Sequence, residues 1–219
     1  MSTLNTNSKT VYSASDIWGA AALAQRVNGA YLKQDEWNYD NNSKGRKANR
    51  DIAKAALLEG TITDADREKG LEARQFLSGR LTMKALTKRL SDFEANLATA
   101  LALDEFIVPQ DRMQIGIVNS QIAAYERTIE EERLTENAVW GYVSEVGMRV
   151  DTKVTPTARF WVDIYGTFRY NAITKDGYKI SFYNRERLEI GNTVDIRGTV
   201  KKQADNVTTL NRVKIKGTK

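Results

Sequence analysis

The spacing of hydrophobic residues changes near residue 137, and this change constrains the fold more than any other feature of the sequence. Before it, apolar residues recur every three or four positions, as in "TMKALTKRLSDFEANLATALAL" over 82–103. After it, apolar and polar residues alternate, as in "ARFWVDIYGT" over 158–167. The first spacing is typical of amphipathic helices and the second of half-buried strands. We therefore predict an α+β chain, with an N-terminal all-α helical domain over 1–137 and a C-terminal β domain over 138–219.

Capping residues and glycines bound the predicted helices. Ser/Asp opens the first segment, Thr63 and Asp66 form a capping arrangement, and Gly60 and Gly79 each follow a run of periodic residues. The helices are predicted over 13–33, 50–60, 63–79, 82–103 and 110–134. The spacing of their apolar residues is too irregular for a long coiled coil, so we expect a bundle core.

A polar, Asn-rich loop is predicted over about 33–50, between the first two helices. It combines acidic and basic residues, namely Asp35, Glu36, Asp40, Lys44, Arg46, Lys47 and Arg50. Carboxylates of this kind can hold Mg²⁺, so a magnesium-dependent nuclease is one hypothesis. Their spacing matches no metal-binding motif, and an exposed loop is the favoured interpretation.

The chain contains no cysteine and no histidine. Disulfide frameworks, zinc ribbons, cysteine nucleophiles and histidine general bases are therefore excluded. No Walker motif or Gly-rich dinucleotide loop occurs either. We expect a protein that is not an enzyme and that needs no cofactor and no metal.

The N-terminus "MSTLNTNSKT" is polar and has no apolar stretch of the kind found in secretory signals. No window approaches the roughly 18 apolar residues that a membrane-spanning helix needs. We therefore expect a cytoplasmic protein without a membrane partner.

Five strands are predicted between residues 148 and 216, with turns at Tyr165-Gly166 and at Lys175-Asp176-Gly177. Gly198 lies inside the fourth strand, where a barrel strand must bend. The segments "VGMRV", "KDG", "IGNTVDIRGTVKKQ" and "TLNRVKI" resemble a C-terminal OB-like domain common in phage and mobile-element proteins. Most members of that family have no assigned function. The resemblance implies a five-stranded OB-like β-barrel.

Positive charge is concentrated in the C-terminal part of the chain. Residues 138–219 contain 15 Lys and Arg against 8 Asp and Glu, whereas residues 1–137 contain 18 against 20. Ten of the 19 aromatic residues also lie after residue 137. Basic residues interleaved with aromatic ones are typical of surfaces that bind single-stranded nucleic acid.

Alternation along the strands divides these side chains between core and surface. It assigns Phe160 and Phe182 to the barrel core. It assigns to the surface Arg159, Trp161, Tyr165, Lys179, Tyr183, Arg197 and Lys201, and we add Arg169 and Arg212 as candidate phosphate contacts. In the last two strands, Lys214 is a further cation that could contact a partner. For Trp161 two roles stay open, stacking on a base and packing against the helical half.

These observations predict a nucleic-acid-binding protein, with single-stranded DNA as the expected ligand, in the DNA replication or recombination of a phage or mobile element. The alternative is a protein–protein interaction module, either an adaptor in a phage-encoded complex or an inhibitor of a host protein. Exposed aromatic residues serve protein interfaces equally well. The helical domain is the expected surface for a protein partner.

Overall fold

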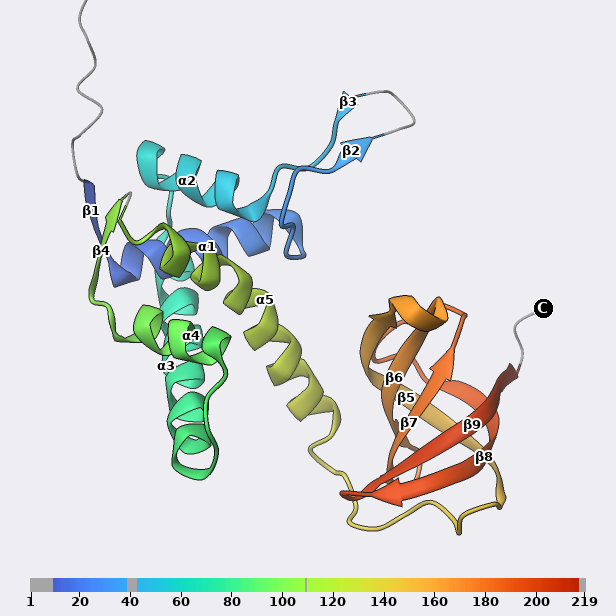
Figure 1. Ribbon diagram of the computed structural model, residues 1–219. Helices are drawn as coiled ribbons and strands as arrows, with labels where there is room; N and C mark the ends of the chain where they lie inside the picture. Colours follow the sequence, from blue (N-terminus) through green and yellow to red (C-terminus); the bar gives the residue numbers. More distant parts are fainter. Residues whose placement is uncertain (1–9, 39–42, 109, 217–219) are drawn as a thin grey trace, which may run out of the picture. The chain divides into compact units, whose positions relative to one another are not determined.

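The computed structural model describes residues 10–38, 43–108 and 110–216 (Figure 1). The chain forms two compact units, residues 1–126 and residues 127–219. The boundary falls inside α5 (Arg112–Leu134), so the last turns of this helix belong to the second unit. The boundary predicted from composition, at residue 137, stays a prediction.

Helices dominate the first unit, as predicted. Besides the start of α5, they are α1 (Ala14–Asn28), α2 (Asn49–Glu59), α3 (Asp64–Thr87) and α4 (Asp92–Ala102). Two short antiparallel ribbons, which the sequence analysis did not predict, accompany them. They pair β1 (Thr10–Ser13) with β4 (Glu105–Val108), and β2 (Trp37–Asn38) with β3 (Ser43–Lys44). Strands of two to four residues are too short to show a periodicity in the sequence.

Helix α1 lies at the centre of the first unit, and most of its residues are buried. Trp18 is fully buried among side chains of the other helices. Helix α3 comes so close that a Cβ on Gly70 would stand 2.4 Å from the carbonyl carbon of Trp18. Glycine at this position therefore permits the contact between the two helix backbones.

The predicted boundaries of three helices were wrong. Helix α1 ends at Asn28, where Gly29 adopts a left-handed φ of 64°, and not at residue 33. Helix α3 continues through Gly79 to Thr87, and the helix predicted over 82–103 is interrupted before α4. A glycine is tolerated inside a helix at a modest cost. Ser91 starts α4 instead, because its side chain and that of Glu94 form a capping box. The capping box that starts α3, between Thr63 and Asp66, was predicted and is confirmed.

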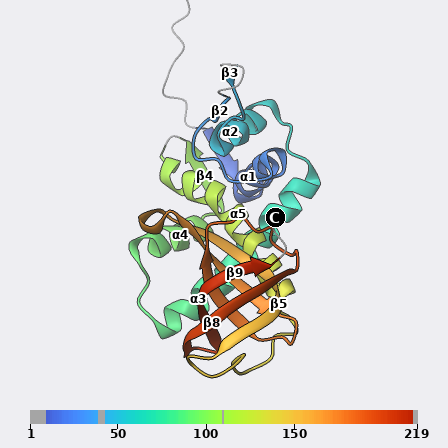
Figure 2. The ribbon, with the colours of Figure 1, turned by 90° about the vertical axis from the view of Figure 1, so that its right-hand side faces the viewer.

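The second unit contains a closed five-stranded barrel, which confirms the predicted fold class. Its strands are β5 (Arg149–Val162), β6 (Thr167–Thr174), β7 (Lys179–Asn184), β8 (Val194–Ala204) and β9 (Val207–Lys216). They follow one another around the barrel in the order β5-β6-β7-β9-β8, and Figure 2 views the barrel from the side of β8 and β9. Among these five strands, β7 and β9 pair in parallel and the other neighbours pair antiparallel. A closed five-stranded barrel fits an OB-like architecture.

The barrel core contains Tyr170, Phe182, Ile196 and Leu210, all fully or almost fully buried. Phe182 was assigned to the core correctly, whereas Phe160 was not, because 43% of its surface is exposed. The register of β5 shifts between Pro156 and Ala158, which reverses the alternation beyond that point.

None of the helices in the described part of the chain is long and apolar enough to cross a membrane.

Candidate nucleic-acid interface

A row of exposed side chains crosses three neighbouring strands of the barrel. Phe160 on β5 lies opposite Arg169 on β6, and Arg169 lies opposite Tyr183 on β7. All three side chains are exposed. The register shift in β5 gives Phe160 this position, so the sequence analysis missed it as a surface residue.

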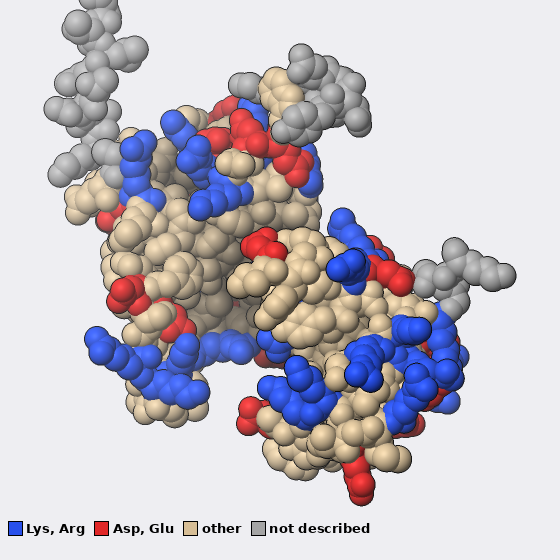
Figure 3. Space-filling model, turned by 45° about the vertical axis from the view of Figure 1, so that its right-hand side comes forward, with Lys and Arg blue, Asp and Glu red and all other residues tan. Residues whose placement is uncertain are grey.

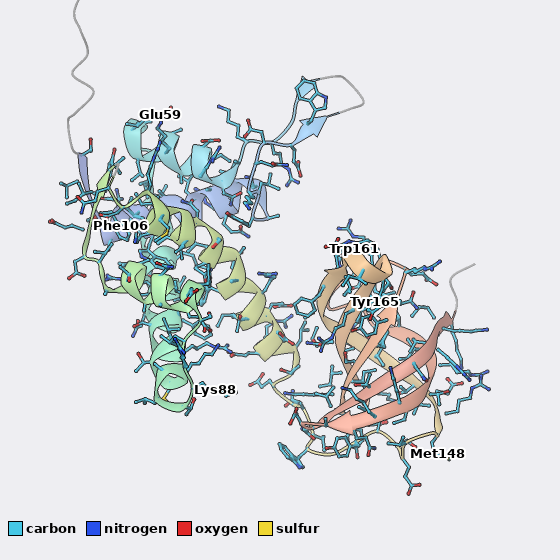
Figure 4. The ribbon with its side chains drawn as sticks, in the orientation of Figure 1. Glu59, Lys88, Phe106, Met148, Trp161 and Tyr165 are labelled. Carbon is cyan, nitrogen blue, oxygen red and sulfur yellow. The ribbon has the colours of Figure 1, made fainter. Side chains whose placement is uncertain are left out.

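A second tyrosine extends the row at the end of β5. Tyr165 closes the single 3-10 turn η1 (Asp163–Tyr165), and Gly166 reverses the chain with a φ of 53°. The ring centroids of Tyr165 and Tyr183 are 6.2 Å apart in an edge-to-face arrangement. Figure 4 shows Tyr165 and Trp161 near the same end of the barrel, and Met148 at the opposite end. The pair presents two aromatic rings on which bases could stack.

Beside Tyr183 the surface forms a shallow groove of about 540 Å³, which we name the Tyr183 groove. Its wall residues come from the start of β6, the end of β7, the loop that follows it, and β9. Its aromatic and cationic residues are Tyr183, Arg185, Arg212 and Lys214. Arg185 follows β7 in an irregular loop, and no pattern in the sequence singled it out.

A β-bulge sets the position of Arg212. The pairing of β8 with β9 shifts between Arg197 and Thr199, opposite Arg212 and Val213. Gly198 makes room for the bulge, because a Cβ there would stand 3.0 Å from Cγ2 of Val213. Arg212 adopts a φ of 52°, in the left-handed region that disfavours residues other than glycine. The irregularity predicted at Gly198 is confirmed, and bulges commonly redirect side chains near functional sites.

The groove lining also contains one acidic residue, Glu186, so the partners of the cations decide whether their charges are available. Among the described residues, no salt bridge involves Arg169, Arg185, Arg212 or Lys214. Figure 3 shows blue Lys and Arg atoms gathered on one face of the barrel. Cations without acidic partners are available to an anionic ligand.

Arg197 differs from them, because it is already paired. Its Nη2 lies 2.7 Å from Oδ2 of Asp151, and Nζ of Lys216 lies 2.5 Å from Oδ1 of the same carboxylate. Hydrogen bonds from Lys216 and Arg197 lower the pKa of Asp151. The position predicted for Arg197 at the surface is confirmed, but its charge stabilises the pairing of β5, β8 and β9.

Arg159 and Trp161 lie together at the end of the barrel. The rings of Trp161 and Phe168 meet edge to face at 4.8 Å, and the guanidinium of Arg159 lies 5.5 Å from the Phe168 centroid. Nη1 of Arg159 also donates a hydrogen bond to the carbonyl of Leu188 at 3.0 Å. The guanidinium of Arg159 is therefore held by contacts with other residues of the barrel domain. The side chain of Trp161 is 54% exposed.

Lys179 and Lys201 do not line the Tyr183 groove. Lys179 begins β7, whereas Tyr183 is near the other end of that strand. Lys201 is exposed on β8. Of the nine predicted site residues, Tyr183 and Arg212 line the groove, and Arg169 and Tyr165 are neighbours of Tyr183.

Comparison of the chain with family models, curated proteins and solved structures finds no match. The site is therefore interpreted from its own chemistry.

Two of the loop carboxylates considered for magnesium, Asp35 and Glu36, form hydrogen bonds within the loop. Glu36 accepts two hydrogen bonds from Arg46, at 2.8 and 2.9 Å, and Oδ1 of Asp35 accepts one from the backbone N–H of Ala48. The hydrogen bond from Arg46 lowers the pKa of Glu36. Asp40 lies outside the described residues. Within the described ranges, no three acidic side chains form a cluster that could hold a metal ion.

Proposed function

We propose that the barrel binds single-stranded nucleic acid along the Tyr183 groove. The observation that carries this proposal is the combination of the exposed ring of Tyr183 with Arg185, Arg212 and Lys214, which form no salt bridge within the described part of the chain. A single strand offers a phosphate and a flat base at every nucleotide. Surfaces that combine cations with aromatic rings can therefore hold it without reading its sequence.

Each group has a separate task in this proposal. Tyr183 stacks on a base, and Tyr165 supports its ring from the edge. Arg185, Arg212 and Lys214 contact phosphates, and Arg169 adds positive charge beside Tyr183. Because the sequence resembles OB-like domains of phage and mobile-element proteins, we propose DNA replication or recombination of such an element as the setting.

Fluorescence anisotropy with a labelled oligothymidylate tests the proposal. The affinity of the full chain should fall as salt rises, because bound phosphates release counterions. Replacing Arg212 by Gln should reduce the slope of log K against log salt by about 0.7, the value for one phosphate contact on a single strand. Lys201→Gln removes the same charge outside the groove and should leave the slope unchanged. Negligible affinity at low salt would refute the proposal.

The alternative, a protein-interaction module, rests on a different observation. Met83 and Leu86, near the end of α3, and Phe93 in α4 are all more than half exposed. Exposed apolar side chains are typical of protein interfaces. Purification of the tagged chain from expressing cells after nuclease treatment tests this alternative. A stoichiometric protein partner that is retained by the wild type and lost with Leu86→Glu would favour it.

A further inference from the structure

The helical unit contains a groove of about 720 Å³ that the proposed function does not use. It lies between α2 and α5, and residues of α1 and of β1 and β4 complete its lining. Its inner surface is apolar: Ile17 and Ala20 come from α1, Leu57 from α2 and Ile115 from α5. The volume is in the range of pockets that bind small molecules. We name it the α2–α5 groove.

Cations surround the apolar inner surface of this groove. Arg50 and Lys54 project from α2 and Arg112 from the start of α5, and all three are exposed. Asp51 is the single acidic residue in the lining, and its Oδ1 lies 3.6 Å from Nε of Arg50. Among the described residues, no salt bridge involves Lys54 or Arg112. The lining therefore has an excess of positive charge, which suits an anionic group.

Asn119 provides an independent indication of a ligand. Its side chain lines the groove and is 2% exposed. Its Nδ2 donates to the carbonyl of Ile115 at 2.9 Å, but Oδ1 is buried and accepts no hydrogen bond from any described group. A buried acceptor without a donor costs about 1–3 kcal/mol. A ligand with an N–H group could remove this cost.

We infer that the α2–α5 groove binds a nucleoside phosphate. The base would lie between the apolar walls, its exocyclic amino group would donate to Oδ1 of Asn119, and the phosphate would contact Lys54 and Arg112. This combination matches the three properties of the site: apolar walls, an unsatisfied acceptor and excess positive charge. The same chemistry belongs to a free nucleotide and to the terminal nucleotide of a strand. The inference stands apart from the Tyr183 groove, which lies in the other unit.

Gly116 offers a way to block the groove without disturbing the fold. It lies in α5 and lines the groove, and no heavy atom lies within 4 Å of the position that its Cβ would take. A side chain at this position begins in open space, and we expect the ring of a phenylalanine there to occupy the groove. Gly79→Phe is the matched control, because Gly79 is also helical and open but does not line the groove.

Isothermal titration calorimetry of the full chain with adenosine 5′-monophosphate tests the inference. We expect saturable binding by the wild type and by Gly79→Phe, and affinity at least about tenfold weaker for Gly116→Phe, with helical circular dichroism retained. Absence of saturable binding by the wild type would overturn the inference. So would equal affinity of the wild type and a folded Gly116→Phe variant.

Two further measurements assign the contacts. Asn119→Leu should weaken binding of adenosine 5′-monophosphate about tenfold, the effect of losing a buried hydrogen bond, and should leave binding of ribose 5-phosphate unchanged. Equal losses for both ligands would contradict the contact between the base and Asn119. Lys54→Glu should weaken both ligands, whereas Lys88→Glu, an exposed residue outside the groove, should weaken neither.

Competition separates the two sources of the ligand. If a 5′-phosphorylated oligonucleotide displaces adenosine 5′-monophosphate from a Tyr183→Ala, Arg212→Gln variant, the groove accepts the end of a strand. If the free nucleotide binds this variant and is not displaced, the ligand is a soluble nucleotide. If the wild type binds adenosine 5′-monophosphate but shows negligible affinity for long oligonucleotides at low salt, the proposed function of the barrel is refuted and this inference stands.

Discussion

The contact between α1 and α3 and the Tyr183 groove use their charged side chains in different ways. In the helical unit, Arg26 forms hydrogen bonds to both carboxylate oxygens of Asp66, and Arg67 pairs with Asp16. These contacts join α1 to α3, so the charges stabilise the fold. In the barrel, the cations of the Tyr183 groove have no acidic partners among the described residues. The comparison separates charges that stabilise a fold from charges available to a ligand.

The cores differ as well. The centre of the helical unit depends on small residues, since glycine at position 70 lets α3 approach the backbone of Trp18. The barrel is filled by large side chains on alternating positions of its strands, such as Tyr170 and Phe182. A close contact between two helices is disrupted when a small residue is replaced by a larger one. A barrel tolerates substitutions at positions whose side chains point outward.

The largest expected effect concerns the close contact between α1 and α3. Gly70→Ala places a Cβ against the backbone of Trp18, so the free energy of unfolding should fall by about 2–3 kcal/mol despite the better helix propensity of alanine. Gly79→Ala, in the same helix but in open space, should raise it by up to about 1 kcal/mol. Urea unfolding followed by helical circular dichroism measures both. Equal effects of the two changes would show that the contact is looser than described.

The next effect concerns the paired charges of the helical unit. Asp66 is buried, accepts hydrogen bonds from Arg26 and caps α3 through Thr63, so Asp66→Asn should lower the free energy of unfolding by about 2 kcal/mol. Thermal unfolding followed by circular dichroism measures this loss. Arg185→Gln, which removes a charge of the Tyr183 groove, should change the stability by less than about 0.5 kcal/mol. A large loss with Arg185→Gln would contradict the distinction between the two sets of charges.

The same carboxylate makes the stability depend on pH. The hydrogen bond from Arg26 is the main cause that lowers the pKa of Asp66, against the effect of burial. A carboxyl group with a depressed pKa in the folded state contributes stability above its unfolded pKa of about 4 and loses it as the pH falls through the lower folded pKa. The wild type should therefore lose stability below about pH 4, and Asp66→Asn should lose less. Thermal unfolding at a series of pH values shows whether the two curves converge in acid.

A smaller effect is expected for the aromatic residues of the barrel. Tyr183→Ala should weaken oligothymidylate binding by about 1–2 kcal/mol, the contribution of a stacked base. Trp161→Ala should weaken it less, because Trp161 packs edge to face on Phe168 and does not line the groove. Fluorescence anisotropy at fixed low salt compares the two. A larger loss for Trp161→Ala would move the binding surface to the end of the barrel.

The smallest effect concerns the strained backbone at Arg212. Glycine adopts its φ of 52° without strain, so Arg212→Gly should raise the stability of the barrel by up to about 1 kcal/mol. The same change should weaken oligonucleotide binding, because it removes a cation of the groove. Thermal unfolding and anisotropy measure the two effects separately. If Arg212→Gly is more stable and binds the oligonucleotide with unchanged affinity, Arg212 does not contact the ligand.

Local patterns in the sequence determined the order of the elements. The change of periodicity predicted helices before strands, Thr63 and Asp66 predicted the start of α3, and Gly198 predicted an irregularity where β8 pairs with β9. These features depend on residues close together in the chain, where capping and alternation act directly. Ser91 and Glu94 have the spacing of a capping box and could have predicted the start of α4. The apolar periodicity over 82–103 continues across them, so this start was missed.

Only the tertiary structure decided which side chains meet. The register shift after Pro156 places Phe160 on the surface, and alternation along a strand does not reveal a shift that pairing with β6 sets. Arg185 and Arg212 share a groove because the end of β7 lies beside β9. Asn119, with its unsatisfied oxygen, lines a groove because α5 lies beside α2. Periodicity is a local property, whereas pairing and packing join residues that are distant in the chain.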